Sequence, residues 1–177
     1  MDKKELRTAV RQKKRAMTEE EIKSKSAKLC QLLADHELYK NAKTFYAYLP
    51  YNQEVRTTAL VEQALREGKR VALPKCYGDT MKFIYMDDLS QVAPGYANIP
   101  EPIADEPGAD DPTALVLMPG MAFDPQGHRI GYGGGFYDKF LAAEPNHPTL
   151  ALCYDFQMLP HLETEEFDIP VDCVLWA

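Results

Sequence analysis

The sequence lacks the cysteine and histidine patterns that mark disulfide scaffolds, zinc sites and thiol redox proteins. No C-x-x-C pair occurs, and no cysteine lies at zinc-ligand spacing from a histidine. We therefore expect reduced, partly buried thiols and surface histidines. The cysteines are Cys30, Cys76, Cys153 and Cys173, and the histidines are His36, His128, His147 and His161.

Long apolar runs are also missing. No stretch reaches the roughly 20 apolar residues that span a bilayer. The N-terminus, MDKKELRTAVRQKKR, is charged from its second residue and has no apolar core of the kind that a secretory signal needs. We expect a cytoplasmic protein without a membrane partner.

The chain has no net positive charge. Its formal net charge is −7, which argues against a dedicated nucleic-acid binder. The charge is uneven, because residues 1–43 hold 12 of the 20 lysines and arginines against 7 acids. This basic segment is either a solvated helix face, which charge alone favours, or a patch that attracts an anionic ligand.

The hydrophobic pattern predicts an α/β protein. Helices are expected over residues 2–16, 57–67 and 136–143, and a further helix is expected to begin at Thr18. Glu21 completes a capping box with Thr18, and Gly68 is a natural end for the helix at 57–67. Strands are expected at 43–49, 70–73, 81–86, 114–118, 149–154 and 171–176. This alternation predicts a mostly parallel central sheet, and 177 residues predict one domain, 1–177, expected to be a monomer.

Two proline features limit these elements. Pro74 is expected to close the strand at 70–73. Residues 87–113 are rich in proline and acidic residues and are expected to form a long surface loop, since strong strand signals resume after it.

The most informative segment is MPGMAFDPQGHRIGYGGGFYDKFL, residues 118–141, which holds six of the ten glycines. It follows a buried strand and leads into a helix, the place where α/β sheets bind ligands. A Gly-rich turn there exposes backbone N–H groups that can cradle a phosphate, although a merely tight turn remains the alternative. No G-K-[ST] follows, and the G-x-G-x-x-G frame is absent, so neither a Walker A loop nor a dinucleotide fingerprint is indicated.

Residues beside the glycines favour phosphate. Arg129 offers a guanidinium fork. Asp138, in the first helical turn, is either an Mg²⁺ ligand or a partner of the helix dipole. Tyr137 can form a flat wall for a ring, whereas core packing is favoured for Phe136. A side chain at Gly134 is expected to crowd the phosphate and to forbid positive φ.

The run P-G-M-A-F-D, then G-H-R-I-G-Y-G-G-G-F-Y-D, resembles the signature of the 5-formyltetrahydrofolate cyclo-ligase family, also called methenyltetrahydrofolate synthetase. The family usually has tyrosine in place of Phe136. K-K-E-L-R (residues 3–7) and F-D-I-P-V-D (residues 167–172) resemble its terminal motifs, so the resemblance covers essentially the whole chain.

The resemblance implies a three-layer α/β/α fold and an activity. The formyl oxygen of 5-formyltetrahydrofolate takes the γ-phosphoryl group of ATP, N10 attacks the formyl carbon, and phosphate leaves, which gives 5,10-methenyltetrahydrofolate, ADP and phosphate. ATP and Mg²⁺ are therefore the expected co-substrate and cofactor.

The resemblance also implies site residues. Arg7, Arg129 and Tyr137 are expected to act in catalysis, and Asp138 and Asp168 to hold Mg²⁺, with Asp172 as the alternative second acid. The residues expected to bind ATP are Lys3, Arg7, Arg129, Gly131, Gly133, Gly134, Gly135, Phe136 and Tyr137. The residues expected to bind folate are Leu49, Glu54, Tyr132, Gly135 and Tyr137.

Several assignments stay open at this point. Without the resemblance, Glu54 reads as an exposed residue before a helix; with it, the carboxylate would bind pterin N–H donors. Lysines near a chain terminus are usually mobile and solvated, and this is the alternative to a phosphate-binding role for Lys3. More weakly, Lys75, Met81, Phe83, Tyr96 and Glu101 are expected at the folate site. The alternative functions are a sugar-phosphate isomerase or CoA-transferase-like enzyme, and a non-catalytic nucleotide- or folate-binding regulator.

Overall fold

A six-stranded sheet forms the centre of the molecule in the computed structural model, which describes residues 1–177. Its strands follow the order β10-β9-β6-β1-β2-β3, and all neighbours are parallel except β2 and β3. The bounds are β1 Thr44–Tyr46, β2 Arg70–Tyr77, β3 Thr80–Met86, β6 Leu115–Met118, β9 Thr149–Cys153 and β10 Cys173–Trp176. The expected mostly parallel sheet is confirmed.

Alternate residues of the central strands supply two separate cores. In β6, Leu115 and Leu117 belong to one core, whereas Val116 and Met118 belong to the other. All four are fully buried, because successive side chains of a strand point to opposite faces and both faces are covered. The uninterrupted apolar run in the sequence is therefore the signature of a doubly covered strand.

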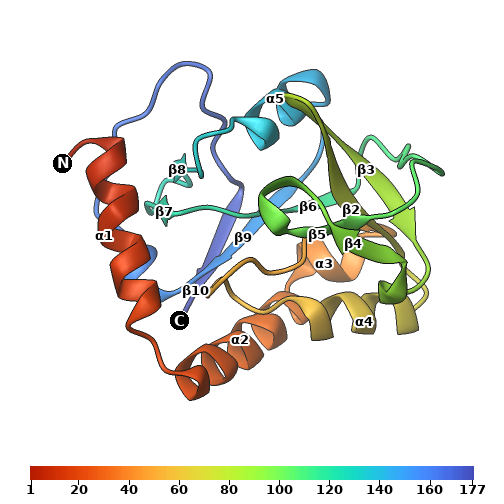
Figure 1. Ribbon diagram of the computed structural model, residues 1–177, viewed down its shortest axis with the longest axis horizontal. Coiled ribbons are helices and arrows are strands. Elements are labelled where there is room, and N and C mark those ends of the chain that lie inside the picture. The colour runs from red at the N-terminus through yellow and green to blue at the C-terminus, as the bar shows by residue number, and fades with distance from the viewer.

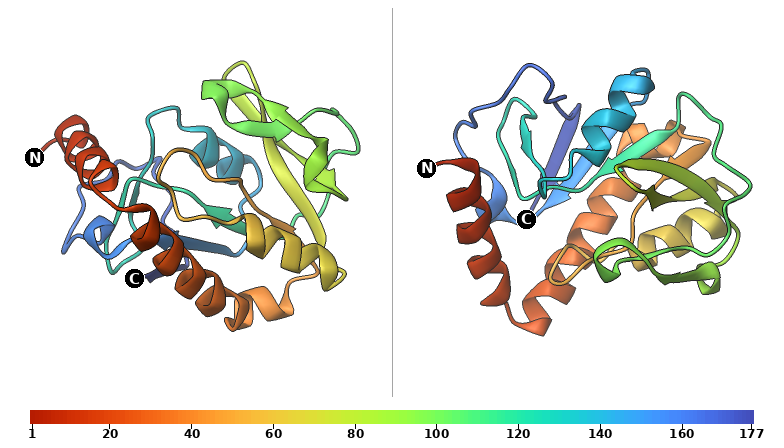
Figure 2. Two further views of the ribbon diagram at one scale, coloured as in Figure 1. Left: turned by 60° about the horizontal axis from the view of Figure 1, so that its bottom comes forward. Right: turned by 45° about the horizontal axis from the view of Figure 1, so that its top comes forward.

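Helices cover the two faces of the sheet. α2 (Glu19–Ala34), α3 (Glu37–Asn41) and α4 (Thr58–Arg66) pack on the face of Leu115, and α5 (Phe136–Ala143) packs on the face of Val116. Figure 2 shows α5 on the side of the sheet opposite α2 and α4. This is the expected three-layer α/β/α arrangement; only the short α3 was not anticipated.

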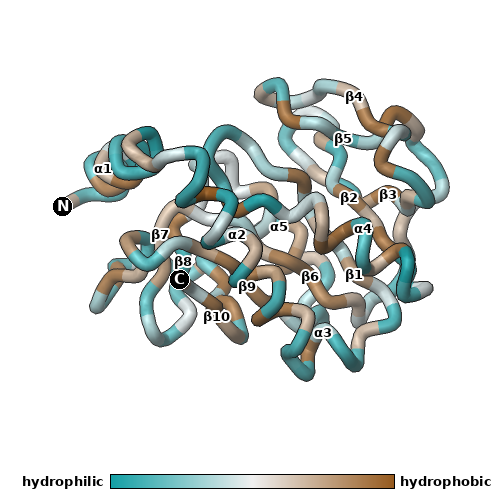
Figure 3. Tube along the Cα trace, turned by 90° about the horizontal axis from the view of Figure 1, so that it is seen from below, coloured by the Kyte–Doolittle hydropathy of each residue, from teal (hydrophilic) through white to brown (hydrophobic).

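The N-terminal helix α1 (Lys3–Arg15) stands at the margin of the molecule, beside the two-stranded β7 (Ala122–Phe123) and β8 (Arg129–Ile130) (Figure 1). A capping box of Asp2 and Glu5 begins it, and the predicted box of Thr18 and Glu21 begins α2. Most of α1 is hydrophilic, in contrast to the strands behind it (Figure 3). None of the helices combines the length and apolar character that crossing a membrane demands.

The predicted limits of two strands are wrong. β1 covers only Thr44–Tyr46, and β2 runs through Pro74 to Tyr77. Because β1 pairs with β2 only as far as Ala72, the later part of β2 pairs with β3 alone. A proline is tolerated where one edge of a strand is free.

Residues 87–113 are more ordered than the predicted loop. β4 (Val92–Pro94) and β5 (Pro100–Pro102) pair antiparallel within it, joined by a 3-10 turn at Tyr96–Asn98. The prolines lie at strand ends, where a missing N–H costs little. We call residues 92–102 the flap, because this hairpin packs against β2 beside the functional cavity described below.

The structure confirms the prediction for the cysteines and contradicts the prediction for one histidine. All four cysteines are free, with Cys153 buried and the others partly buried, as expected. His147, by contrast, is not at the surface: it is buried, with its ring between the carbonyl of Ala114 and the carboxylate of Glu144. Both ring nitrogens find partners there, which makes burial of this polar group tolerable.

Candidate active site

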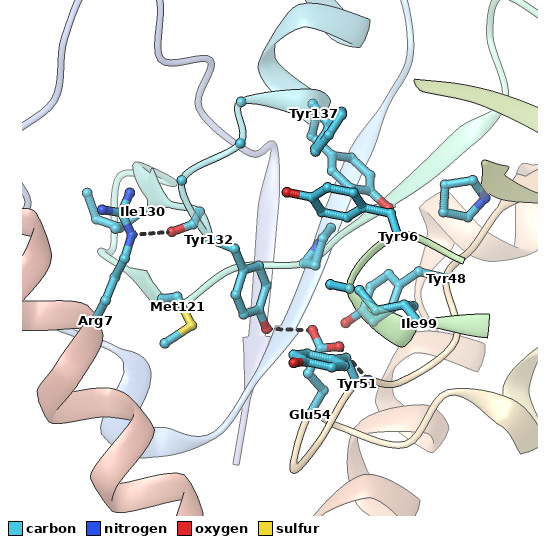
Figure 4. Close-up of a pocket in the computed structure, with 18 of the residues that line it drawn as sticks. Arg7, Tyr48, Tyr51, Glu54, Tyr96, Ile99, Met121, Ile130, Tyr132 and Tyr137 are labelled. Atoms are coloured by element: carbon cyan, nitrogen blue, oxygen red, sulfur yellow. Dashed lines mark hydrogen bonds between the residues drawn. The ribbon is translucent and has the colours of Figure 1, made fainter. Parts of the chain in front are cut away.

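One large cavity, of about 630 Å³, opens beside the carboxyl ends of β1 and β6. Segment 48–54 follows β1, and segment 119–121 follows β6. α1, the flap and the segment 129–138, here called the glycine loop, complete its walls. Ligands of α/β proteins bind at this edge of the sheet, so the cavity is the candidate active site (Figure 4).

The glycine loop presents backbone donors to the cavity. Gly133 has φ +114° and Gly135 has φ +69°, conformations that glycine adopts without a steric penalty. Gly135 is the N-cap of α5 and provides no side-chain cap, so the first N–H groups of the helix are left for another acceptor. The positive φ expected at Gly134 is wrong, since the strained positions are its two neighbours.

Arg129 lies beneath this loop and is almost completely buried. Its Nη1 donates to the carbonyl of Pro119 at 3.0 Å, and its Nη2 pairs with Asp138 at 3.3 Å, while Nε has no partner. A Cβ on Gly131 would come within 2.9 Å of Nη1. The guanidinium therefore supports the glycines of the loop from behind, and a side chain at Gly131 would have to displace it.

α1 contributes a row of cations. Lys3, Arg7, Arg11 and Lys14 all line the cavity, because spacings of four, four and three residues keep them on one helix face. Arg7 Nε donates to the carbonyl of Gly131 at 2.8 Å (Figure 4). Lys3 pairs with Asp168 at 3.3 Å. The structure thus brings Arg7 to the glycine loop and Lys3 to Asp168 in the wall of the same cavity.

Asp138 and Asp168 lie together at the same end of the cavity. Ile169, the neighbour of Asp168, donates its N–H to Asp138 at 3.3 Å. Asp172 is elsewhere: it accepts from the backbone and hydroxyl of Thr149 and does not line the cavity. No group of three or more potential metal-ligating side chains occurs, so any Mg²⁺ here would need most of its oxygens from phosphate and water, as Mg²⁺ commonly does.

Glu54 lies at the other end, and its reading as an exposed residue is wrong. It is 8% exposed and accepts from the backbone N–H of Tyr51 and the hydroxyl of Tyr132, each at 2.6 Å. Burial raises the pKa of Glu54, while the Tyr132 hydrogen bond, the charge of Lys14 and the Tyr51 N–H oppose that rise. A buried carboxylate that faces a cavity is a functional-site candidate.

The remaining predicted residues mostly line the same cavity. Leu49, Tyr137 and all four glycines of the loop from Gly131 onward do so. Phe136 makes an edge-to-face contact with Tyr96 of the flap at 5.1 Å, so its side chain is not simply in the core. Met81, Tyr96 and Glu101 line the cavity, but Lys75 and Phe83 do not.

Several lining residues were missed in the sequence, among them Lys14, Arg11, Tyr48, Tyr51 and Met121. The two cations carry a signal, since they continue the helical spacing that begins at Lys3 and Arg7. The tyrosines and Met121 carry none, because they lie in irregular segments whose direction is set only by the packed fold.

Comparisons with known proteins give a consistent result. The family model described as 5-formyltetrahydrofolate cyclo-ligase matches residues 1–177. The 5-formyltetrahydrofolate cyclo-ligase of Escherichia coli K12 is 31% identical, over 94% of this chain and 95% of that protein. That of Mus musculus is 28% identical, over 97% of this chain and 91% of that protein.

Solved structures agree. The chain resembles a structure described as the 5,10-methenyltetrahydrofolate synthetase of Aquifex aeolicus, with a TM-score of 0.87 and 31% identity over 99% of this chain and 90% of that one. A synthetase from Mycoplasma pneumoniae shares the fold, with a TM-score of 0.76 over 98% of each chain. A family match along the whole length, with a relative that is 31% identical over almost the whole of both chains, makes this chain a member of the 5-formyltetrahydrofolate cyclo-ligase family.

Proposed function

We propose that the chain catalyses the ATP-dependent cyclisation of 5-formyltetrahydrofolate to 5,10-methenyltetrahydrofolate, with release of ADP and phosphate. The observation that carries the proposal is that one cavity is lined at one end by uncapped backbone N–H groups and cations and at the other by buried Glu54. One end suits phosphates and the other suits a ring with N–H donors. Neither a sugar-phosphate isomerase nor a regulator is favoured by the relatives.

The chemistry requires activation of a poor electrophile. The formyl oxygen forms a bond to the γ-phosphorus of ATP as the bond to ADP breaks. N10 then attacks the formyl carbon, the carbon–oxygen bond to phosphate breaks, and the N10 proton is released. The protein's task is to align two substrates and to stabilise phosphoryl charge.

The glycine-loop end is proposed to hold ATP. The N–H groups at the start of α5 and the side chains of Lys3 and Arg7 would contact the phosphates. Arg129 would hold the loop in shape and add positive charge behind it. Tyr137, at the junction of the two ends, would place the formyl group beside the γ-phosphate.

Mg²⁺ is part of this proposal, and the carboxylates present fit it. Asp138 and Asp168 are hard oxygen donors at the glycine-loop end, and each is already held by an ion pair, Asp138 with Arg129 and Asp168 with Lys3. When bound, Mg²⁺ would neutralise charge on the phosphate oxygens. Asp138 and Asp168 would hold it, and Arg129 and Lys3 would orient them.

The Glu54 end is proposed to hold folate. A carboxylate has about four acceptor positions, and two are used by Tyr51 and Tyr132. The remaining two match the ring N3–H and 2-amino donors of a pterin. Leu49, 8% exposed, would give the ring an apolar contact.

A direct assay tests the proposal. Purified protein with 5-formyltetrahydrofolate and MgATP should develop the absorbance of the methenyl product in proportion to ADP formed. The absence of turnover by folded protein would overturn the assignment. We also propose that residues 1–177 form one domain and that the protein is a cytoplasmic monomer. Light scattering of the active protein would measure its mass and so test the monomeric state.

A further inference from the structure

Lys14 is an anomaly of α1. It is one of two buried residues of α1, and at 6% exposed it is nearly as buried as the apolar Val10, which is 3% exposed. It lines the cavity, and its Nζ lies 5.7 Å from the centre of the Tyr132 ring. The ammonium of Lys14 makes no hydrogen bond and no ion pair, whereas lysines that are this buried are almost always paired.

The place of Lys14 in the cavity is set by its neighbours. Tyr132, a residue of the glycine loop, donates to Glu54 at 2.6 Å, so the ammonium above the Tyr132 ring lies where the glycine loop meets Glu54. Burial lowers the pKa of Lys14, and the charge of Glu54 opposes that change. An acceptor-only carboxylate and a donor-only ammonium therefore face the same end of the cavity.

We infer that Lys14 is a substrate-binding residue that donates to the 4-oxo group of the pteridine ring, beside the N3–H and 2-amino donors that Glu54 accepts. This inference rests on the proposed function and deepens it. The edge of the ring presents two donors followed by one acceptor. Glu54 with its two open acceptor positions and the unpartnered Lys14 present the complementary set.

Charge complementarity makes Lys14 a specificity residue. An ammonium has three donors and no acceptor, so it favours an oxo group and opposes an amino group at the same ring position. A buried polar group that is left unpaired is penalised strongly. The site should therefore discriminate between 5-formyltetrahydrofolate and its analogue with a 4-amino group in place of the 4-oxo group.

The test measures the dissociation constants of these two compounds by calorimetry without ATP, for the wild type and for Lys14→Gln. Glutamine can donate to an oxo group and accept from an amino group. The preference for the oxo compound should fall by about tenfold or more in Lys14→Gln, the size of one hydrogen bond to a charged donor. The 4-amino group also changes the contact of the ring with Glu54, but it does so in both proteins. Comparing the ratio of the two dissociation constants between the wild type and Lys14→Gln therefore cancels that effect.

Matched variants separate this hydrogen bond from a general effect of charge or stability. Lys13→Gln makes the same charge change at the next residue, which is exposed and does not line this cavity; its ratio should equal that of the wild type. Lys14→Met should leave the melting temperature unchanged or raise it, because burial of the Lys14 side chain lowers its pKa and so disfavours its charged form, while weakening the binding of 5-formyltetrahydrofolate.

Each outcome has one meaning. If Lys14→Gln weakens both compounds equally, the lysine only balances the charge of Glu54, and the inference is overturned. It is also overturned if ATP binding weakens instead. If the wild type turns over but the ratio of the two dissociation constants is unchanged in Lys14→Gln, this inference alone is overturned. If the wild type does not turn over, the proposed function is overturned.

Discussion

The two ends of the cavity differ in how the chain builds them. At the end that is proposed to bind phosphate, one continuous segment, 129–138, supplies the loop, and its proposed donors are backbone N–H groups. At the Glu54 end, Lys14 of α1 and Glu54 of the segment after β1 meet Tyr132, a side chain of the glycine loop that is 78 residues away from Glu54. A backbone site depends on glycine conformations and therefore on local sequence, whereas a side-chain site depends on which segments the fold brings together.

The two ends should therefore respond differently to substitutions. Substitutions at the backbone end should act through conformation and affect ATP. Substitutions at the side-chain end should act through lost hydrogen bonds and affect folate. Four experiments, from the largest expected effect to the smallest, test that division.

Glu54→Gln should have the largest effect. The substitution removes the charge that two pterin donors would share, and hydrogen bonds to charged groups contribute about 1.5 kcal/mol or more each. The kcat/KM for 5-formyltetrahydrofolate should fall by roughly 100-fold, while the Kd for ATP stays unchanged. Steady-state kinetics and calorimetry measure the two quantities; an unchanged KM for folate would place the ring elsewhere.

Arg7→Ala should come next, at the phosphate end. Arg7 holds the Gly131 carbonyl and is proposed to contact phosphate, so its loss should cost about 1–3 kcal/mol in ATP affinity and kcat together. Arg7→Lys should recover only part, since a point charge lacks the planar fork. Lys4→Ala, on the exposed side of α1, is the control and should be nearly silent. Normal kinetics for ATP in Arg7→Ala would refute the assignment.

Gly133→Ala tests whether the loop acts through backbone shape. A new Cβ there meets no atom within 4 Å, so the cost arises from φ +114° alone and should be about 1–2 kcal/mol. ATP should bind roughly tenfold more weakly and folate equally well.

Gly78→Ala provides the matched control for this loop. Gly78 also has positive φ and open space around its Cβ, but it lies outside the cavity. The two variants should lower the melting temperature similarly, yet only Gly133→Ala should weaken ATP binding. Equal ATP affinity in both would make the glycine loop purely structural.

Asp138→Asn and Asp168→Asn should have the smallest effects, seen as a several-fold rise in the Mg²⁺ concentration for half-maximal activity, because each removes one hard anionic ligand. Asp172→Asn should instead lower the melting temperature without changing the Mg²⁺ titration, since its carboxylate serves only Thr149. An Mg²⁺ effect confined to Asp172→Asn would reverse the assignment of the second acid.

Local patterns in the sequence predicted most helices and strands of the three layers and the position of the glycine loop. The capping box at Thr18, the buried run of β6 and the helix at 136–143 follow from hydrogen-bonding and hydrophobic rules that act over a few residues. The row that begins with Lys3 and Arg7 also follows from helical spacing. These features need no knowledge of distant contacts.

Only the tertiary structure decided the rest. Pro74 lies inside β2 because β1 ends early and frees one edge, and His147 is buried because Glu144 and the Ala114 carbonyl meet its ring. Glu54 and Lys14 look like ordinary surface residues in the sequence, but segments far along the chain cover them. Whether a polar side chain is exposed or faces a cavity depends on what packs over it, and that is a property of the whole fold.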